Sequence, residues 1–369
     1  MNIARLLTPS LDWLLVSIPL AVYFEHARPE AHTPIFLFSC AAIIPLAKWL
    51  GVATEHIAER AGEGIGGFLN ATLGNAAELI IALVALKAGQ IEVVKASLSG
   101  SIIGNILLVL GASFLAGGLR HRIQEFNPLA AQAQIMTLTV ASSALIVLSA
   151  FYHLGKEQVR VRTEDLSVVI SIILLVAYAL NLWFSLRTHK ELFRGKVSPS
   201  PEEAPKGSAA SGHAPTWGMG RSIGVLGIAT FFIAWMSEML VGSVSEAAKT
   251  MGISNVFIGV IVVALIGNAA EHSTAVIAAM KDRMDLGVNI AVGSSSQIAL
   301  FVAPVLVLLS YVIAPSPMSL TFSSGEGLAV ILSISVLWQV ASDGRSHWFK
   351  GVLLLTVYVI LAAAFYMVT

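Results

Sequence analysis

The chain has 369 residues, of which 56% are hydrophobic and 12% are charged, and its formal net charge is zero. Soluble domains carry about 25% charged residues, so this composition indicates a polytopic membrane protein. The neutral balance argues against nucleic-acid binding, which depends on a basic surface. The single cysteine, Cys40, excludes a disulfide framework and a cysteine-based zinc site.

Eleven apolar runs follow one another along the chain. They are 11–24, 33–53, 68–88, 97–118, 128–152, 167–186, 221–245, 255–280, 287–313, 325–342 and 349–368. Several are close to the roughly 20 residues that a spanning helix needs, although the first is short. The sequence therefore predicts an all-α polytopic membrane protein with about eleven transmembrane helices.

A polar segment between the sixth and seventh runs divides the chain. Residues 187–220 are rich in Pro, Ser, Gly and charged residues, a composition typical of a flexible linker. We therefore predict an extra N-terminal transmembrane helix in residues 1–30 and a first five-helix repeat in residues 31–186. A second five-helix repeat is predicted in residues 221–369.

The distribution of positive charge predicts the orientation. Most of the 22 Lys and Arg residues fall in segments on the same side as the N-terminus. The positive-inside rule then places the N-terminus and the linker in the cytoplasm, and eleven spans place the C-terminus outside. We expect an integral protein of the prokaryotic inner (cell) membrane. Whether it forms a homo-oligomer is left open.

One pentapeptide, Gly-Asn-Ala-Ala-Glu, occurs twice inside apolar runs, at 74–78 and 267–271. A carboxylate near the bilayer centre costs at least about 2.5–3.5 kcal/mol, which makes both copies candidates for a functional site. Gly100-Ser101 and Gly293-Ser294 follow the two copies at the same spacing. Since each repeat has an odd number of helices, the second must enter the membrane from the opposite side. Inverted repeats of this kind are common in secondary transporters, whose site lies at the repeat interface.

The polar residues of each copy share one face of a helix. They are Gly74, Asn75 and Glu78 in the first copy and Gly267, Asn268 and Glu271 in the second. Two carboxylates and two amides offer hard oxygen ligands, which suit Ca²⁺ or Mn²⁺. Two ionised carboxylates in an empty buried site would be unfavourable, so we expect Glu78 and Glu271 to take up protons when the cation leaves.

Further polar residues are expected to line this site. The helices after the two motifs supply Ser101, Asn105, Ser294, Ser295, Ser296 and Gln297. His272 and Glu238 are candidates for a proton relay. Purely structural roles compete with these: serines in membrane helices often bond to their own helix, and His272 or the motif asparagines could serve packing alone.

The two motifs resemble the signature repeats of the calcium/proton exchangers, the CAX family of the cation/calcium exchanger superfamily. The resemblance rests on GNAAELIIAL at 74–83 and on GNAAEHSTAV at 267–276 followed by GSSSQIALFV at 293–302. It implies a transporter that exports Ca²⁺ from the cytoplasm in exchange for protons by alternating access. It also implies that Glu78 and Glu271 bind cation and protons in turn, without a cofactor.

Three residues depart from the family pattern. Gly104 stands where members often have Ser, and His347 and Lys350 replace the more usual Asn and acidic residue of the loop SDGRSHW at 342–348. The sequence leaves the roles of these positions open.

Several alternatives remain beside this hypothesis. A sodium/calcium exchanger, or a broader divalent-cation exchanger that carries Mn²⁺, would share the fold. A passive cation channel is disfavoured because a channel needs an open polar pathway, often built by several subunits. A metal-dependent enzyme is disfavoured because the histidines are few and scattered and no His-Glu-x-x-His motif is present.

Overall fold

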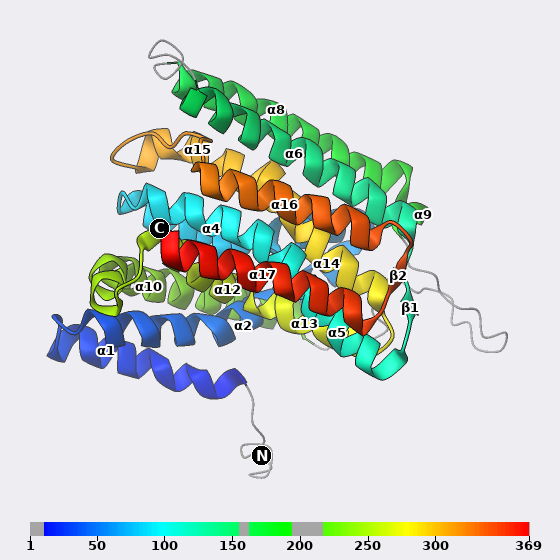
Figure 1. The fold of residues 1–369 in the computed structure, drawn as a ribbon. Helices are drawn as coiled ribbons and strands as arrows, with labels where there is room; N and C mark the ends of the chain where they lie inside the picture. Colours follow the sequence, from blue (N-terminus) through cyan, green and yellow to red (C-terminus); the bar gives the residue numbers. More distant parts are fainter. Residues whose placement is uncertain (1–10, 155–161, 194–216, 369) are drawn as a thin grey trace.

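The computed structural model describes residues 11–154, 162–193 and 217–368, and almost all of them are helical. Within these described ranges, eight helices are long and apolar enough to cross a membrane, and two bent helix pairs bring the number to as many as ten (Figure 1). The N-terminal helix, which is shorter, precedes them. The predicted all-α polytopic fold is confirmed.

The first half of the described chain contains eleven helical elements and a short strand. In chain order they are η2 (Leu11–Val16), α1 (Ser17–Ala27), α2 (His32–Leu73), α3 (Ala76–Lys87), α4 (Ile91–Ile103), η3 (Gly104–Val109), α5 (Leu110–His121), β1 (Gln124–Glu125), α6 (Pro128–Leu154), α8 (Thr163–Trp183), η4 (Phe184–Thr188) and α9 (Lys190–Phe193).

The described chain resumes at residue 217, after the undescribed segment 194–216, and the first helix of the second half starts at Met219. The elements of this half are α10 (Met219–Met251), α11 (Asn255–Phe257), η5 (Ile258–Val263), α12 (Ala264–Gly267), α13 (Ala269–Met280), α14 (Met284–Gln297), η6 (Ile298–Val302), α15 (Ala303–Ile313), α16 (Ser324–Ala341), β2 (Arg345–Ser346) and α17 (Trp348–Val368).

The two halves repeat the same order of spans. Each has a long helix, then a bent pair, then a helix interrupted by a π-helical turn, and then two further helices. Contacts between the two halves also occur in equivalent pairs. Helix α5 packs on α17, and the equivalent helix α15 packs on α8. Likewise α14 packs on α6, and α4 packs on α16. The long helices α2 and α10 pack against each other, and α1 lies at one edge of the bundle beside α2 (Figure 1).

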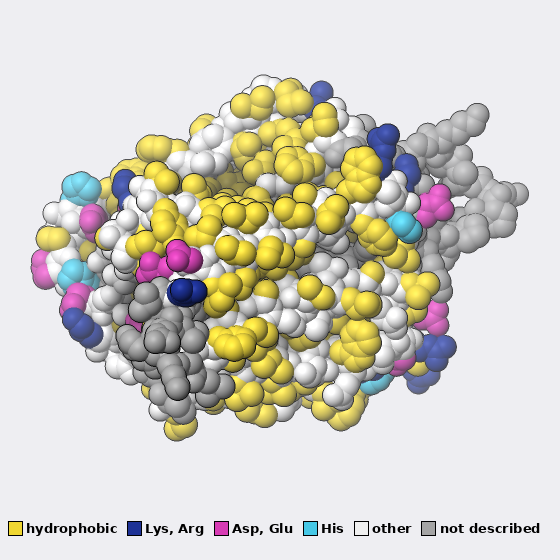
Figure 2. All heavy atoms as spheres, turned by 90° about the horizontal axis from the view of Figure 1, so that it is seen from above, with side chains coloured by type: hydrophobic (Ala, Val, Ile, Leu, Met, Phe, Trp, Pro, Cys, Tyr) yellow, Lys and Arg dark blue, Asp and Glu magenta, His cyan; other side chains and the backbone are white. Residues whose placement is uncertain are grey.

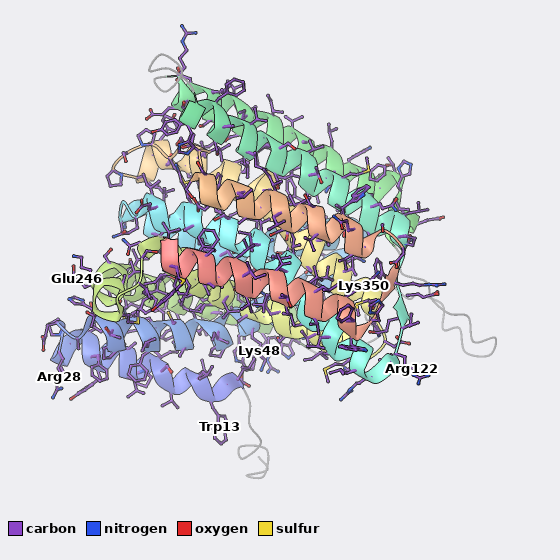
Figure 3. The ribbon with its side chains drawn as sticks, viewed as in Figure 1. Trp13, Arg28, Lys48, Arg122, Glu246 and Lys350 are labelled. Carbon is purple, nitrogen blue, oxygen red and sulfur yellow. The ribbon has the colours of Figure 1, made fainter. Side chains whose placement is uncertain are left out.

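The surface agrees with a membrane-embedded body. Hydrophobic side chains cover much of the face drawn in Figure 2, and most charged side chains lie toward its two ends. Arg28 and Glu246 lie at one end of the bundle, and Arg122 and Lys350 lie at the other (Figure 3). At this second end β1 pairs with β2, joining the loop after α5 to the loop after α16.

Several predicted boundaries need correction. The run 68–88 is not one helix, because it breaks between Leu73 and Ala76. The helix before it continues to Gly62, whose φ of +81° suits glycine and ends the first span of α2. The predicted linker 187–220 has helical edges in η4, α9 and α10, while its centre lies outside the described residues.

Candidate functional site

Both motif helices break at the Gly-Asn step. The helix ending at Leu73 bends by 47° into α3, and the helix ending at Gly267 bends by 61° into α13. Asn75 and Asn268 occupy the N-cap positions of α3 and α13. The predicted continuous helical face is therefore wrong. Each Glu instead lies in the first turn of a new helix, where the free N–H groups and the helix dipole favour a negative charge.

The two motifs pack against each other reciprocally. A Cβ atom added to Gly267 would lie 3.0 Å from Glu78 Cγ and 3.5 Å from its Oε1. A Cβ atom added to Gly74 would lie 3.6 Å from Glu271 Oε1. Each glycine thus leaves room for the carboxylate of the other copy, and the carboxylates are close enough to interact electrostatically.

A chain of amides and hydroxyls connects the two copies. Asn75 Nδ2 donates to Gln297 Oε1 at 2.7 Å, and Ser294 Oγ donates to Asn75 Oδ1 at 2.7 Å. Asn105 Nδ2 reaches Ser294 Oγ at 3.2 Å and Asn268 Oδ1 at 3.3 Å. All these side chains except Gln297 are buried. Polar groups inside a membrane protein require such pairing.

This network has the symmetry of the repeats. Asn268 Nδ2 donates to Ser101 Oγ at 2.9 Å, which matches the contact of Asn75 with Ser294. The position equivalent to Gln297 is Gly104, so the first repeat has no side chain there. Asn105, one residue further along and within the π-helical turn η3, contacts the opposite motif instead. π-helical turns of this kind frequently occur at functional sites.

Three of the four carboxylate oxygens have no hydrogen-bond partner among the described residues. Both oxygens of Glu78 and Oε2 of Glu271 are buried and unpaired among the described residues. Glu78 also lines a pocket with Ser97, Ser101 and Gly267. The described residues contain no group of three or more His, Cys, Asp or Glu side chains placed to hold a metal ion. An ion here would have to take amide, hydroxyl or backbone oxygens beside the two carboxylates, as Ca²⁺ does.

The other predicted residues differ in their contacts and in their distance from the site. Ser295 and Ser296 donate to carbonyls of their own helix, at 2.9 Å to Ala291 O and 3.0 Å to Val292 O, so they are structural in this arrangement. His272 is next to the site, and its Nε2 is buried without a partner in the described part of the chain. Glu238 lies on an exposed face of α10, unlike the buried motif residues.

Sequence reasoning missed one polar residue close to the network. Gln134 of α6 donates from Nε2 to Asn289 Oδ1 at 3.0 Å, and its backbone carbonyl accepts from Ser296 at 3.4 Å. Two amides in the run 128–152, Gln132 and Gln134, were the available signal. Nothing in their spacing linked them to either motif, because α6 and α14 are far apart in the chain.

Comparison with known proteins shows which family the chain belongs to. The family described as sodium/calcium exchanger protein matches residues 32–187 and again 221–367. A Ca²⁺/H⁺ antiporter of Synechocystis is 43% identical, over 96% of each chain. The Ca²⁺/H⁺ antiporter ChaA of Bacillus subtilis is 42% identical, over 90% of this chain and 92% of its own. The chain belongs to the calcium/proton exchanger (CAX) family.

Solved structures agree with this membership of the CAX family. The structure of native YfkE has a TM-score of 0.81 at 38% identity, and covers 97% of this chain and 100% of its own. A sodium–calcium exchanger, NCX_Mj, has a TM-score of 0.54 at 18% identity, and covers 95% of this chain and all of its own. The latter likeness concerns the fold alone. The membrane-embedded fold is therefore that of the wider exchanger superfamily, within which this chain is a CAX member.

Proposed function

We propose that the chain is a Ca²⁺/H⁺ antiporter, a secondary active transporter that exports Ca²⁺ from the cytoplasm in exchange for protons. Membership of the CAX family and relatives named as Ca²⁺/H⁺ antiporters support the exchange. Bacterial relatives favour the cell membrane as its location. The passive channel becomes an unnecessary hypothesis, because an exchanger family accounts for the repeat architecture.

The observation that carries the mechanism is the face-to-face pair of Glu78 and Glu271. Their unpaired buried oxygens lie at the meeting point of the two broken helices. Two carboxylates neutralise one divalent cation, and amide or hydroxyl oxygens of Asn75, Asn268 and Ser101 can complete its shell. When the cation leaves, protons must replace it, because two ionised carboxylates cannot share a buried site cheaply.

Exchange follows if the site is accessible from one side at a time. The site then changes sides only while it carries Ca²⁺ or protons, since the empty charged form is disfavoured. The reciprocal packing of the glycines and carboxylates supports this coupling, because the two broken helices meet where the ion would bind. Movement of one repeat against the other would carry the site between the two faces.

The experiment is Ca²⁺ uptake into everted membrane vesicles whose interior is acidified. Wild type should take up Ca²⁺ without Na⁺, and Glu78→Gln or Glu271→Gln should reduce uptake to the level of vesicles lacking the protein. Glu238→Gln is the matched control, since this Glu is exposed and outside the site. Flux that persists in the double Gln variant would refute the proposed site.

The same assay separates the remaining exchanger hypotheses. A requirement for a Na⁺ gradient would favour a sodium/calcium exchanger. Mn²⁺ uptake with the same dependence on Glu78 and Glu271 would favour a broader divalent exchanger, which hard oxygen ligands permit.

A further inference from the structure

A polar face of α14 leads from the end of that helix to the amide network. Asp285, Asn289, Gly293 and Gln297 are spaced four residues apart, so they lie on one side of α14. All four are partly exposed, whereas most of their helical neighbours are buried. At 1.5 Å per residue this face extends about 18 Å, close to half of the roughly 30 Å hydrocarbon core.

Gln134 of α6 forms the opposite wall of this face. Its Nε2 donates to Asn289 Oδ1 at 3.0 Å and lies 3.9 Å from where a Gly293 Cβ atom would sit. No other atom outside the helix backbone comes within 4 Å of that position among the described residues. Gln134 Oε1 is buried and has no hydrogen-bond partner in the described part of the chain. Buried acceptors of this kind are usually satisfied by ordered water.

The first repeat offers no equivalent. The corresponding positions are Glu92, Ala96 and Gly100 on α4 and Gly104 at the start of η3. A Cβ atom at Gly100 would overlap the backbone carbonyl of Val260, and one at Gly259 would lie 2.5 Å from Ala96 Cβ. Helix α4 is therefore sealed against η5, and the polar face exists in the second repeat alone.

We propose that Asp285, Asn289, Gln134 and the space at Gly293 order a chain of water molecules that carries protons between the membrane surface and Glu271. This inference rests on the proposed function and adds that protons use a route separate from that of the divalent cation. Ser294 donates to Asn75 Oδ1 at 2.7 Å, and the preceding residue, Gly74, lies against Glu271, whose Oε1 is 3.6 Å from the Gly74 Cβ position, so the network reaches the carboxyl group. A proton leaves that carboxyl group for water as another proton leaves the chain at its far end.

The chemistry of the face suits protons rather than Ca²⁺. A dehydrated Ca²⁺ ion needs six to eight oxygen ligands, whereas between Asp285 and the network this face offers neutral amides. The Asn289 oxygen is already engaged by Gln134. Asp285 Oδ1, at the outer end, accepts from the backbone N–H of Asn127 at 2.6 Å. A water chain needs only donors and acceptors in sequence.

Two transport modes distinguish a proton route from a cation route in reconstituted vesicles. Exchange of ⁴⁵Ca²⁺ for unlabelled Ca²⁺ moves no net proton. Ca²⁺/H⁺ exchange, in contrast, needs a working route along which protons reach the site. Gln134→Met removes the amide and keeps the side-chain length, Asn289→Leu does the same on α14, and Gly293→Val fills the space. Thr139→Val is the control on α6, because that hydroxyl bonds back to Ile135 O at 2.7 Å.

We expect each of the three variants to lose about tenfold or more of Ca²⁺/H⁺ exchange, a typical effect of an impaired proton transfer. Ca²⁺/Ca²⁺ exchange should stay near the wild-type rate, which also shows that the variant folds. Thr139→Val should keep both modes. Loss of both modes in all three variants, or of neither, would overturn the proton route.

The proposed function fails differently. If Glu78→Gln and Glu271→Gln retain Ca²⁺/H⁺ exchange, the site itself is wrong. Suppose instead that the two Glu→Gln variants are inactive while the Gln134, Asn289 and Gly293 variants keep both transport modes at the wild-type rate. The proposed ion site is then supported, and the separate proton route is refuted.

Discussion

Glycine has opposite consequences at two positions one helical turn apart, Gly100 in α4 and Gly104 at the start of η3. At Gly100 a Cβ atom would overlap the carbonyl of Val260, while at Gly104 it would meet no atom within 4 Å. We expect Gly100→Ala to lower the free energy of unfolding by about 1–3 kcal/mol through overpacking. Gly104→Ala should be neutral or stabilising by up to about 1 kcal/mol, because alanine favours the helix.

Thermal unfolding of the two purified variants in detergent tests this difference. Gly104→Ser belongs in the same series, since the space at this position admits the hydroxyl that family members often carry. Equal unfolding temperatures for Gly100→Ala and Gly104→Ala would contradict the close crossing of α4 and η5.

Residue chemistry alone predicted the centre of the site. Glu78 and Glu271 are anomalous wherever a span is drawn around them, and the repeated motif links them without any structure. The partner of each amide was not predictable in the same way. Asn105 and Gln297 differ in spacing from their motifs, and only the π-helical turn at η3 explains how Asn105 reaches Asn268.

Lys350 at the start of α17 holds the preceding loop together. Its Nζ donates to Val340 O at 2.8 Å, Asp343 Oδ1 at 2.6 Å and Arg345 O at 2.8 Å. The cation thus binds a carbonyl near the end of α16 and two oxygens of the following loop. An acidic side chain, more usual at this position, could not donate these hydrogen bonds. We expect Lys350→Met to cost about 1–3 kcal/mol of stability, because hydrogen bonds from a charged group are lost. Asp343→Asn, the control, should cost less than about 1 kcal/mol, since its side chain is 53% exposed.

The same contact has a pH dependence. Burial raises the pKa of Asp343, but the hydrogen bond and charge of Lys350, together with backbone hydrogen bonds that include one from Arg345, outweigh burial and hold this pKa below the ordinary value. The stabilisation is therefore present above the unfolded pKa of about 3.9 and disappears as the pH falls through the lower folded value. The unfolding free energies of wild type and Asp343→Asn should converge at a pH below the lowered folded pKa of Asp343. A constant difference down to that pH would exclude the Asp343–Lys350 ion pair as its source.

The ends of the helices were predictable where the sequence changes from apolar to polar, and they were not predictable within a continuous apolar run. The ends of most runs agree with the observed helices within a few residues, because polar loops flank them. The break at Leu73 was invisible since apolar residues continue on both sides. The break leaves Gly74 and Asn75 between the two helices, and there the carboxylate of Glu271 approaches Gly74 from the other repeat, a contact that no local pattern encodes.

The pseudo-symmetry of the whole molecule is incomplete in a way that fits an exchanger. Helix α4 closes against η5, whereas Gly293 on the equivalent helix α14 faces open space next to Gln134. Two repeats that were identical in conformation would leave both sides of the site equally closed. Access from one side at a time requires such a difference, and interconversion would exchange the two arrangements between the repeats.

The number of spans between two exposed residues makes a parity prediction for the whole molecule. Arg28 and Arg345 are exposed. With both bent pairs crossing, nine spans separate the two, so they lie on opposite sides of the membrane. In a Cys40→Ala background, which removes the single cysteine, we expect a membrane-impermeant maleimide to label Arg28→Cys on intact cells. Arg345→Cys should be labelled only in everted vesicles, since the positive-inside rule places this end of the bundle in the cytoplasm.

Exposed lysines after each bent pair make the test specific. Lys87→Cys should be labelled on intact cells and Lys281→Cys in everted vesicles, because Lys87 ends the first bent pair and Lys281 directly follows the second. If the first pair entered and left on the same side, Lys87→Cys would instead be labelled in everted vesicles together with Arg60→Cys. The two motifs would then enter the membrane from the same side, and the inverted relation that brings Glu78 to Glu271 would be lost.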